Sequence, residues 1–408
     1  MSLKEINIGS LGQVITGNTP PKKDPKNYGG SHPFVKPTDM TIGKRFVDKW
    51  DETYSEKAFE KYKRSLIPSG ATGVVTIGTV GEKIFQSNQD CFTNQSVNVV
   101  IPNEDYDKDY VFYILKLNLN KVLSANPGTS SGRHHVSKSN FCSIKIDVVS
   151  CKKAQKKIAS ILSAYDDLTE NNLKRIQLLE EAAQRIYKEW FVDFKFPNHE
   201  KTGINKETGL PEGWRIGAVE DLVNISSGFA FKSKDWKKSG NSVLKIKNLQ
   251  NNTINVSDTA FVDNETTLKA SKYELFEGDV LIAMTGATVG KIGLIPKVKK
   301  RLFLNQRVGL FRSIDGESNI PFIFSFFISD NGQKQVVNFA QGAAQPNISS
   351  SQIGQIQLNI PEKITLIYFN NKIGKFLKQI QLLNYQNQNL KEARDLLLPR
   401  LMNRTIEV

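Results

Sequence analysis

The chain has 408 residues, of which 39% are hydrophobic, so it is long enough for two or three domains that each bury a core. Its formal net charge of +14 favours a polyanionic partner, with DNA or RNA as the first candidate. Three cysteines without a Cys-x-x-Cys pair argue against a disulfide framework and a zinc site, and the longest apolar run is far too short to span a bilayer, so we expect a cytoplasmic protein with no membrane partner.

The first 150 residues have the pattern of a mixed α/β domain. A polar loop at 19–30 contains Pro, Gly and three lysines, and it is also suited to contact phosphate. Short stretches rich in β-branched or aromatic residues predict strands at Gly73 to Ile77, Phe92 to Ile101 and Phe141 to Val149. Tyr110 to Val122 is predicted to be a short buried helix.

A long helix is predicted next, from Lys152 to Phe194. Its apolar residues recur with alternating steps of four and three, which is a heptad pattern that forms one apolar edge between charged flanks. The positions on this seam are Ile158, Leu162, Tyr165, Thr169, Asn172, Ile176, Leu179, Ala183, Ile186 and Trp190. Such a helix needs a partner helix to cover its edge.

A second α/β pattern follows a polar linker at Pro197 to Trp214. Strands are predicted at Asp279 to Ala283, Leu302 to Phe311 and Gln355 to Ile360, and a short buried helix at Pro321 to Ser329. The second domain therefore has the same kind of elements as the first.

The C-terminal segment repeats the heptad pattern and supplies the partner helix. Its seam consists of Leu366, Phe369, Ile373, Phe376, Ile380, Leu383, Asn387, Leu390, Arg394, Leu397 and Leu401. If the two helices run antiparallel with Ile158 opposite Leu401, every seam position of one helix lies opposite a seam position of the other.

In this register Asn172 faces Asn387, Ala183 faces Phe376 and Trp190 faces Phe369. A buried Asn pair would fix the register, whereas two asparagines on solvated parts of the seam would only be tolerated. Roughly 40 helical residues would make a spacer of about 60 Å. Two similar domains held apart in this way would meet DNA in two successive major grooves.

An internal repeat underlies this organisation. Leu11 to Gly17 resembles Leu222 to Gly228, and Asn94 to Val97 resembles Asn305 to Val308, in each case about 210 residues further on. The string Ile-Gln-Leu-Leu begins at both Ile176 and Ile380. The order is therefore domain, helix, domain, helix.

Two short motifs favour structural interpretations. Gly286 to Lys291 has one residue too few for a phosphate-binding loop and Ile292 in place of Ser or Thr, so we predict a tight turn between strands. Asn319 to Phe322 resembles the Asn-Pro-Pro-Phe tetrad of adenine methyltransferases, but Ile320 interrupts it. We predict a helix start with Pro321 at its first position. The four histidines form no recognisable catalytic or metal-binding pattern.

Several of these features together resemble the specificity subunit of type I restriction-modification systems. They are the lead-in Leu210 to Trp214, the segment Leu222 to Gly228, the turn Gly286 to Gly290 and the motif Gln345 to Ser349, within the repeat of domain and long helix. The segment Gly128 to Val136 departs from the Gln-Pro-Asn motif of the second half.

The resemblance implies an α/β (α+β) fold class, with two target-recognition domains separated by two long antiparallel helices that form a coiled coil. The predicted boundaries are 1–150 and 197–361 for the domains and 151–196 and 362–408 for the helices. A non-catalytic subunit is implied. Each domain would read one half of a bipartite, asymmetric double-stranded DNA site, and the helices would set the gap and dock two methyltransferase subunits.

Nuclease/translocase subunits would complete the assembly. S-adenosylmethionine, ATP and Mg are implied for those partner subunits, and no cofactor for this chain.

Candidate DNA contacts are basic, amide and hydroxyl side chains near strand ends and in loops. Lysine mostly contacts phosphate, whereas Arg, Gln and Asn can read base edges. The first-domain candidates are Lys22, Lys23, Lys36, Thr38, Asp39, Thr79, Arg133, His134, His135 and Lys138. The second-domain candidates are Lys232, Lys234, Lys245, Lys247, Asn248, Thr288, Arg301, Arg307, Gln341, Gln345 and Asn347.

Some candidates correspond between the two halves of the repeat: Lys36, Thr38 and Asp39 correspond roughly to Lys245, Lys247 and Asn248.

Two interpretations stay open for the Gly- and Ser-rich loop that contains Arg133. The loop either enters the groove, where Arg133 would make a bidentate contact to guanine, or is merely solvated.

Two other functions fit the sequence less well. A coiled-coil adaptor with two protein-binding domains is disfavoured by the basic charge. A self-sufficient DNA methyltransferase or nuclease would need a catalytic constellation that the sequence does not show.

Overall fold

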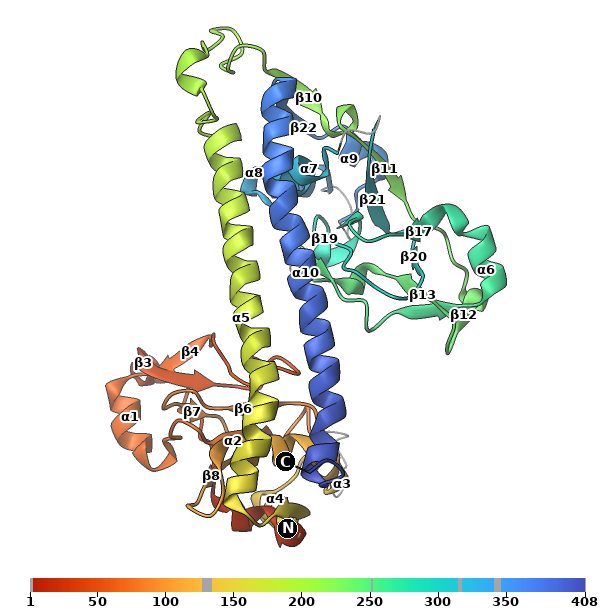
Figure 1. Ribbon diagram of the computed structural model, residues 1–408. Coiled ribbons are helices and arrows are strands. Elements are labelled where there is room, and N and C mark those ends of the chain that lie inside the picture. The colour runs from red at the N-terminus through yellow and green to blue at the C-terminus, as the bar shows by residue number, and fades with distance from the viewer. Residues whose placement is uncertain (1–2, 127–133, 251, 315–317, 341–345, 408) are drawn as a thin grey trace. The chain divides into compact units, whose positions relative to one another are not determined.

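The computed structural model describes residues 3–126, 134–250, 252–314, 318–340 and 346–407. The chain divides into two compact units, Met1–Glu170 with Asn389–Val408, and Asn171–Gln388. Each unit includes part of both long helices, α5 (Lys152–Phe191) and α10 (Lys363–Met402), which Figure 1 shows in full.

The described part of the first unit contains three small sheets and four short α-helices. One sheet has the order β2-β8-β5-β6, a second β4-β3-β7, and a third pairs β1 with β9. The strands are β1 (Leu3–Asn7), β2 (Gly12–Thr16), β3 (Tyr28–Val35), β4 (Glu52–Tyr54), β5 (Thr72–Val75), β6 (Ile84–Gln86), β7 (Phe92–Thr93), β8 (Val97–Pro102) and β9 (Lys145–Val149). The short helices are α1 (Glu56–Tyr62), α2 (Lys108–Leu117), α3 (Leu119–Ser124) and α4 (Lys138–Ser143).

The second unit repeats this topology with additional strands. Its sheets have the orders β11-β21-β18-β19-β15-β14, β12-β16-β13-β20-β17 and β10-β22. The strands are β10 (Arg215–Ala218), β11 (Val223–Ser227), β12 (Trp236–Lys237), β13 (Asn241–Leu244), β14 (Leu249–Gln250), β15 (Asn252–Ile254), β16 (Ala260–Val262), β17 (Glu274–Leu275), β18 (Val280–Ala283), β19 (Ile292–Leu294), β20 (Leu302–Leu304), β21 (Val308–Ser313) and β22 (Gln357–Ile360). The short helices are α6 (Asn264–Lys269), α7 (Ile320–Ile328), α8 (Asp330–Ala340) and α9 (Ser350–Gly354).

The repeat predicted from sequence is confirmed strand by strand. The antiparallel order β2-β8-β5-β6 corresponds to β11-β21-β18-β19, and the parallel pair β3·β7 corresponds to β13·β20. The terminal pairs β1·β9 and β10·β22 are both antiparallel. Both halves of the chain therefore adopt the same mixed α/β fold.

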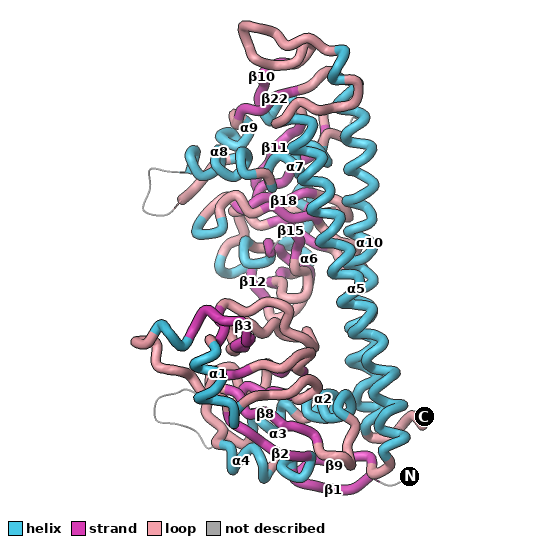
Figure 2. Tube along the Cα trace, turned by 90° about the vertical axis from the view of Figure 1, so that its left-hand side faces the viewer, coloured by secondary structure: helices cyan, strands magenta, loops and turns pink. Residues whose placement is uncertain are grey.

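A buried apolar helix forms the centre of each unit. In the second unit the core cluster joins Phe322 and Phe326 of α7 to Phe311 of the sheet and to Trp190 and Phe369 of the long helices. In the first unit α2 takes the same place, with six consecutive buried residues from Tyr110 to Leu115. Figure 2 shows α2 and α7 next to the long helices of their own units.

The predicted antiparallel register of the long helices is confirmed within each unit. In the first unit Ile158 and Leu401 share the core cluster. In the second unit the Asn172 side chain donates a hydrogen bond to Asn387 at 2.9 Å, and the rings of Trp190 and Phe369 lie 5.6 Å apart. Asn172 and Asn387 are 1% and 5% exposed, so the buried interpretation of this pair is the right one.

Five predicted elements differ from the structure. The stretch Phe92 to Ile101 is two strands, and so is Leu302 to Phe311, because an Asn in each turn, Asn94 or Asn305, bonds the main chain two residues on. Phe141 belongs to α4, which begins after the capping residue Ser137, so the following strand starts only at Lys145.

The helix predicted at Tyr110 to Val122 is divided at Asn118, whose side chain donates to the carbonyl of Ile114. The helix predicted at Pro321 begins one residue earlier, with Asn319 as its N-cap, so Pro321 is its second residue. The turn predicted at Gly286 to Gly290 is confirmed between the antiparallel strands β18 and β19.

Candidate nucleic-acid interface

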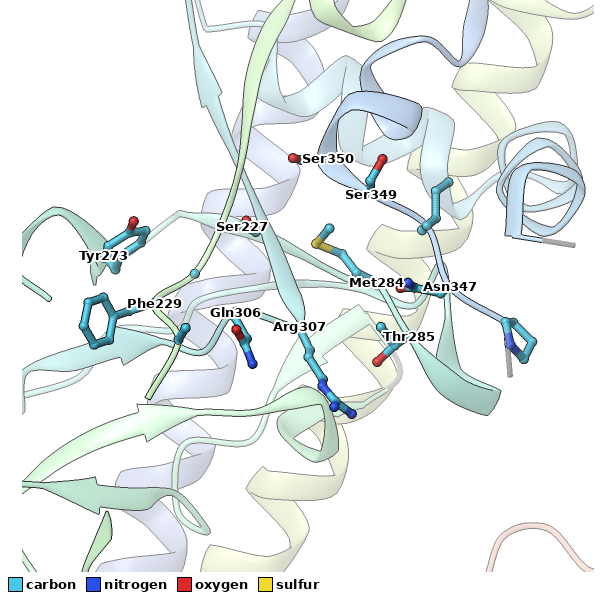
Figure 3. A pocket seen from close by; sticks show the side chains of 14 residues that line it. Ser227, Phe229, Tyr273, Met284, Thr285, Gln306, Arg307, Asn347, Ser349 and Ser350 are labelled. Atoms are coloured by element: carbon cyan, nitrogen blue, oxygen red, sulfur yellow. The ribbon is translucent and has the colours of Figure 1, made fainter. Parts of the chain in front are cut away.

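A cleft of about 880 Å³ opens at one end of the six-stranded sheet of the second unit. Three segments meet there: the end of β11, the turn between β20 and β21, and the chain that leads into α9 (Figure 3). The lining residues are Ser227, Gly228, Phe229, Ala230, Tyr273, Met284, Thr285, Gln306, Arg307, Pro346, Asn347, Ile348, Ser349 and Ser350. The cleft thus collects polar side chains from three distant parts of the chain.

Main-chain hydrogen bonds hold the approach to α9 against the end of β18. The Gly286 N–H donates to the carbonyl of Pro346 at 2.9 Å, and the Ile348 N–H donates to the carbonyl of Met284, also at 2.9 Å. Thr285 and Asn347 form an isolated bridge between these bonds. The start of the Gly286 turn is therefore bonded to the segment Pro346 to Ser349, and this segment forms one wall of the cleft together with Met284 and Thr285.

Arg307 and Gln306 supply the exposed polar groups of the second wall. Figure 3 shows their side chains projecting in the same direction as that of Thr285. The main-chain carbonyl of Arg307 accepts from Met284 N–H at 3.2 Å, which fixes the backbone. The guanidinium forms no ion pair or hydrogen bond with any residue that the structure describes, so it is available to a ligand.

The first unit has a cleft of about 380 Å³ at the equivalent place. It lies at the end of β2, as the larger cleft lies at the end of β11, and at the start of α4, which corresponds to α9. The lining residues are Ile15, Thr16, Asn18, Lys61, Tyr62, Arg64, Ser65 and Lys138. Two clefts in matching positions point to a shared role.

The same main-chain bonds recur beside the first cleft. The Gly78 N–H donates to the carbonyl of His134 at 3.0 Å, and the Val136 N–H donates to the carbonyl of Thr76 at 2.8 Å. Ile77 and His135 form the isolated bridge. Although the first half lacks the Pro-Asn motif, its backbone is held in the same way, with His134 and His135 in the places of Pro346 and Asn347.

Glycine is required where each cleft strand ends. The Gly17 N–H donates to the carbonyl of Val97 on β8, and the next amide donates to that of Thr93 on β7. Gly228 and the residue after it make the equivalent bonds to β21 and β20. A Cβ at Gly17 would lie 2.1 Å from the carbonyl oxygen of Thr93, and one at Gly228 would lie 2.4 Å from that of Leu304. Because real Cβ atoms do not approach backbone so closely, only glycine lets the strand turn here.

The side chains of the first cleft are strongly basic. Lys61, Arg64 and Lys138 are exposed, and Arg64 and Lys138 make no ion pair within the part of the chain that the structure describes. Lys138 was among the predicted contacts, whereas Lys61 and Arg64 were missed. The basic run Lys61-Tyr-Lys-Arg64 with its tyrosine at the end of α1 was the signal for them.

Comparison with known proteins now decides the family. The sequence profile of the type I restriction modification DNA specificity domain matches residues 2–181 and 211–393. The chain belongs to this family. The two matched segments coincide with the two halves of the internal repeat.

Two named relatives can be aligned with nearly the whole length of this chain. The chain is 25% identical to the type I restriction enzyme MjaIX specificity subunit of Methanocaldococcus jannaschii, over 97% of this chain and 91% of the relative. It is 26% identical to the MjaVIII specificity subunit of the same organism, over 99% and 92%. Such proteins are specificity subunits, so this chain is a non-catalytic component.

A solved structure agrees at the level of the fold. The S subunit of a type I restriction-modification system from M. genitalium superposes with a TM-score of 0.60 at 16% identity, over 98% of this chain and 96% of the other. The fold predicted from the resemblance is thereby confirmed.

Several predicted contacts of the specificity subunit have partners within its own fold. Asn248 is 1% exposed, and its amide donates to the carbonyls of Asn255 and Asp258 at 2.9 and 2.8 Å. Its side-chain oxygen accepts from the Lys245 N–H. The Asn248 side chain therefore stabilises its own turn, and the structure leaves no exposed polar group on it for a ligand.

The corresponding turn of the first unit is built in the same way. The Asp39 carboxylate accepts from the Lys36 N–H at 2.7 Å, as Asn248 accepts from Lys245. The ammonium of Lys36 lies 3.4 Å from the Glu52 carboxylate. The predicted correspondence between the two turns is confirmed, and it reflects a shared backbone bend.

Three further basic candidates are held by neighbours in the second unit. Arg301 donates two hydrogen bonds of 2.7 Å to Glu274, which keeps the pKa of that carboxyl below its ordinary value. The Lys247 ammonium lies 2.8 Å from Asp258. Lys245 lies 3.5 Å from the ring centre of Trp236, and burial followed by the charge of Lys247 lowers its pKa.

The remaining candidates lie outside the two clefts or outside the described residues. Thr288 is half-buried in its turn. His134 has its imidazole 2.8 Å from the side-chain amide of Asn126, and His135 is exposed. Exposed side chains belong to Lys22, Lys23, Thr38, Thr79, Lys232 and Lys234. Arg133, Gln341 and Gln345 lie outside the described residues.

Within the described ranges no three His, Cys, Asp or Glu side chains gather as a metal site would require. No described helix is both long enough and apolar enough to cross a bilayer.

Proposed function

We propose that each unit reads one half of a bipartite, asymmetric double-stranded DNA site through its cleft. One observation carries the proposal: the two clefts share their main-chain hydrogen bonds but differ in the side chains that they present. The first offers Lys61, Arg64 and Lys138, and the second offers Arg307 and Asn347. Arg and Lys match the acceptor pair of guanine and Asn matches adenine, so unlike clefts select unlike half-sites.

The long helices are proposed to set the gap between the half-sites and to bind two methyltransferase subunits. The support is that α5 and α10 are each 40 residues long and uninterrupted from one unit into the other. The functional segments are proposed as 1–150, 151–196, 197–361 and 362–408. The site of action is proposed to be the cytoplasm, where the DNA is.

This chain is proposed to need no cofactor. S-adenosylmethionine, ATP and Mg would be bound by the methyltransferase and nuclease/translocase subunits that complete the assembly.

The test is methylation mapping with single cleft variants in the assembled methyltransferase. Arg64→Ala should relax the specificity of one half-site and Arg307→Ala that of the other, each with a loss of about 1–3 kcal/mol in binding to the mapped site. Arg215→Ala is the matched control, because Arg215 lies on β10 and is bonded to Asp221. If both cleft variants weaken binding equally on all sequences, the clefts contact phosphate and do not read bases.

The gap is tested by lengthening both helices. Seven residues inserted after Glu170 and seven after Gln388 should widen the gap by about 10 Å, or about three base pairs. An unchanged gap would show that the helices do not set it.

A further inference from the structure

Two buried polar contacts join the long helices, one in each unit. In the second unit the Asn172 amide donates to the side-chain oxygen of Asn387 at 2.9 Å. In the first unit Arg394 forms a hydrogen-bonded ion pair with Asp166, and these side chains are 3% and 5% exposed. Buried polar groups of this kind destabilise a seam unless each finds its partner.

The pair in the first unit is also fixed to the globular part. The second carboxylate oxygen of Asp166 accepts from the Tyr113 hydroxyl on α2 at 2.6 Å, and Arg394 donates to the carbonyl of Gly43 at 3.4 Å. Burial, followed by the charge of Asp166, raises the pKa of the Tyr113 hydroxyl, so it remains a donor. The position of the Asp166 carboxylate is therefore strongly determined.

The repeat places different residues at the same four positions of the two helices. Aligned through Ile176 and Ile380, the pairs of equivalent residues on α5 and α10 are Asp166 with Asn370, Asn172 with Phe376, Ala183 with Asn387, and Trp190 with Arg394. In the observed seam, polar residues lie opposite polar residues and apolar residues opposite apolar ones, as where Trp190 packs on Phe369. Asn370 lies outside the seam: its side chain donates a hydrogen bond to the side-chain oxygen of Asn319 and accepts one from the Phe322 N–H.

From these contacts we infer that the seam accepts only a helix of the other repeat, so that α5 pairs with an α10 helix and not with α5 of a second copy. In an α5 pair of the same antiparallel register, Asp166 would meet Trp190 and Asn172 would meet Ala183. In an α10 pair, Arg394 would meet Asn370 and Asn387 would meet Phe376. Each like pair would bury these mismatches twice. Asp166 would keep Tyr113 and Arg394 would keep Asp395, but each would lose its partner on the other helix, and this loss selects against the wrong pairing.

The pairing rule has a consequence for recognition, which depends on the proposed function. Because the seam combines one helix of each repeat, every assembled molecule contains one recognition unit of each kind. A pair of like repeats would read a palindromic site, and the mismatched seam excludes it. The asymmetry of the site would thus be determined in the helices as well as in the clefts.

The test uses the full chain with one protease site placed in the exposed linker after Lys206. The chain is cut after purification, unfolded, refolded and analysed by native mass spectrometry. Random pairing of the two pieces gives mixed and like pairs in a ratio of about one to one. The inference expects mixed pairs to exceed like pairs at least about tenfold. A random ratio would overturn it.

A variant tests the role of the four positions directly. Asn387→Ala with Arg394→Trp gives α10 the residues that α5 has at these places, so the C-terminal piece should now pair with itself. The control Gln386→Ala with Leu396→Ala changes exposed positions of the same helix and should leave mixed pairing unchanged. Mixed pairing retained in the Asn387→Ala, Arg394→Trp variant would overturn the inference.

The uncut variant provides a second measurement in case the pieces refold poorly. Light scattering of the full Asn387→Ala, Arg394→Trp chain should show dimers where the unaltered chain and the control are monomers. Equal masses for all three chains would count against the inference. The sequence read by the unaltered, uncut chain is measured separately, so a failed pairing rule and a failed DNA-reading function give different results.

Discussion

The side-chain amide of Asn172 donates a hydrogen bond of 2.9 Å to the side-chain oxygen of Asn387, where α5 and α10 pack in the second unit. Both residues are buried and they occupy opposing seam positions. The bond joins residues that are far apart in the chain, and it fixes the register of the helix pair by requiring two polar groups to coincide.

Replacement of one member of this pair should destabilise the protein. In Asn172→Ala the buried Asn387 loses its partner, so we expect the free energy of unfolding to fall by about 1–3 kcal/mol. The double variant Asn172→Leu with Asn387→Leu should recover most of this loss or exceed the starting stability. Urea unfolding followed by circular dichroism measures both, and a double variant less stable than the single one would contradict the expected coupling.

Asn248 should matter for stability and not for DNA specificity. Asn248→Ala removes the donor for two main-chain carbonyls and the acceptor for Lys245, so we expect a loss of about 2–3 kcal/mol in unfolding free energy. Lys247→Ala, one residue earlier and exposed, is the control and should cost less than about 0.5 kcal/mol. A stable Asn248→Ala protein with altered base preference would instead make Asn248 a contact residue.

Glu180 should make the stability of the second unit depend on pH. Burial, opposed by a hydrogen bond from Asn252 and assisted by the charge of Glu181, raises the pKa of the Glu180 carboxyl from 4.5 to about 7. At pH values between 4.5 and about 7, the Glu180 carboxyl is ionised in the unfolded chain and protonated in the folded chain. The contribution of Glu180 to stability is therefore most favourable below about pH 4.5 and is lost as the pH rises through about 7.

The variant Glu180→Gln should remove this dependence. At pH 8 it should be more stable than the unaltered chain by about 1–2 kcal/mol, a value reduced for partial solvent exposure, and at pH 4 the two should be equal. Glu181→Gln, at an exposed position, is the control. Thermal unfolding at both pH values measures the difference, and equal stability at pH 8 would show that Glu180 is ionised at no cost.

Lys232 and Lys234 should contribute to binding without affecting which sequence is read. If each contacts a phosphate, its replacement by Ala lowers the slope of log affinity against log salt concentration by about 1. Arg301→Ala is the control, because this guanidinium is occupied by Glu274 and should leave the slope unchanged. Titrations at several salt concentrations distinguish these outcomes, and an unchanged slope for both lysine variants would place them away from the DNA.

Much of the fold followed from spacing in the sequence. The heptad steps gave the seam and its register, since a repeat of three and four places one face of a helix against its partner. The ion pair between Asp166 and Arg394 was not predicted. Asp166 lies beside the seam position of Tyr165, and its burial depends on Tyr113 of α2. Tertiary partners of this kind leave no local pattern.

The candidate site was predicted less completely. Arg307 and Asn347 were found because they lie within recognisable motifs, whereas Lys61 and Arg64 reach the first cleft only through the packing of α1. Asn248 was selected as a candidate because a polar residue after a short strand has the same sequence pattern whether it bonds its own backbone, as it does here, or a ligand.

The bonds that shape both clefts join main-chain atoms, such as the Ile348 N–H and the Met284 carbonyl, or the Val136 N–H and the Thr76 carbonyl. Exchanging the neighbouring side chains breaks none of them. If the clefts read DNA as proposed, new DNA preferences can therefore evolve by single substitutions in either cleft without loss of the fold.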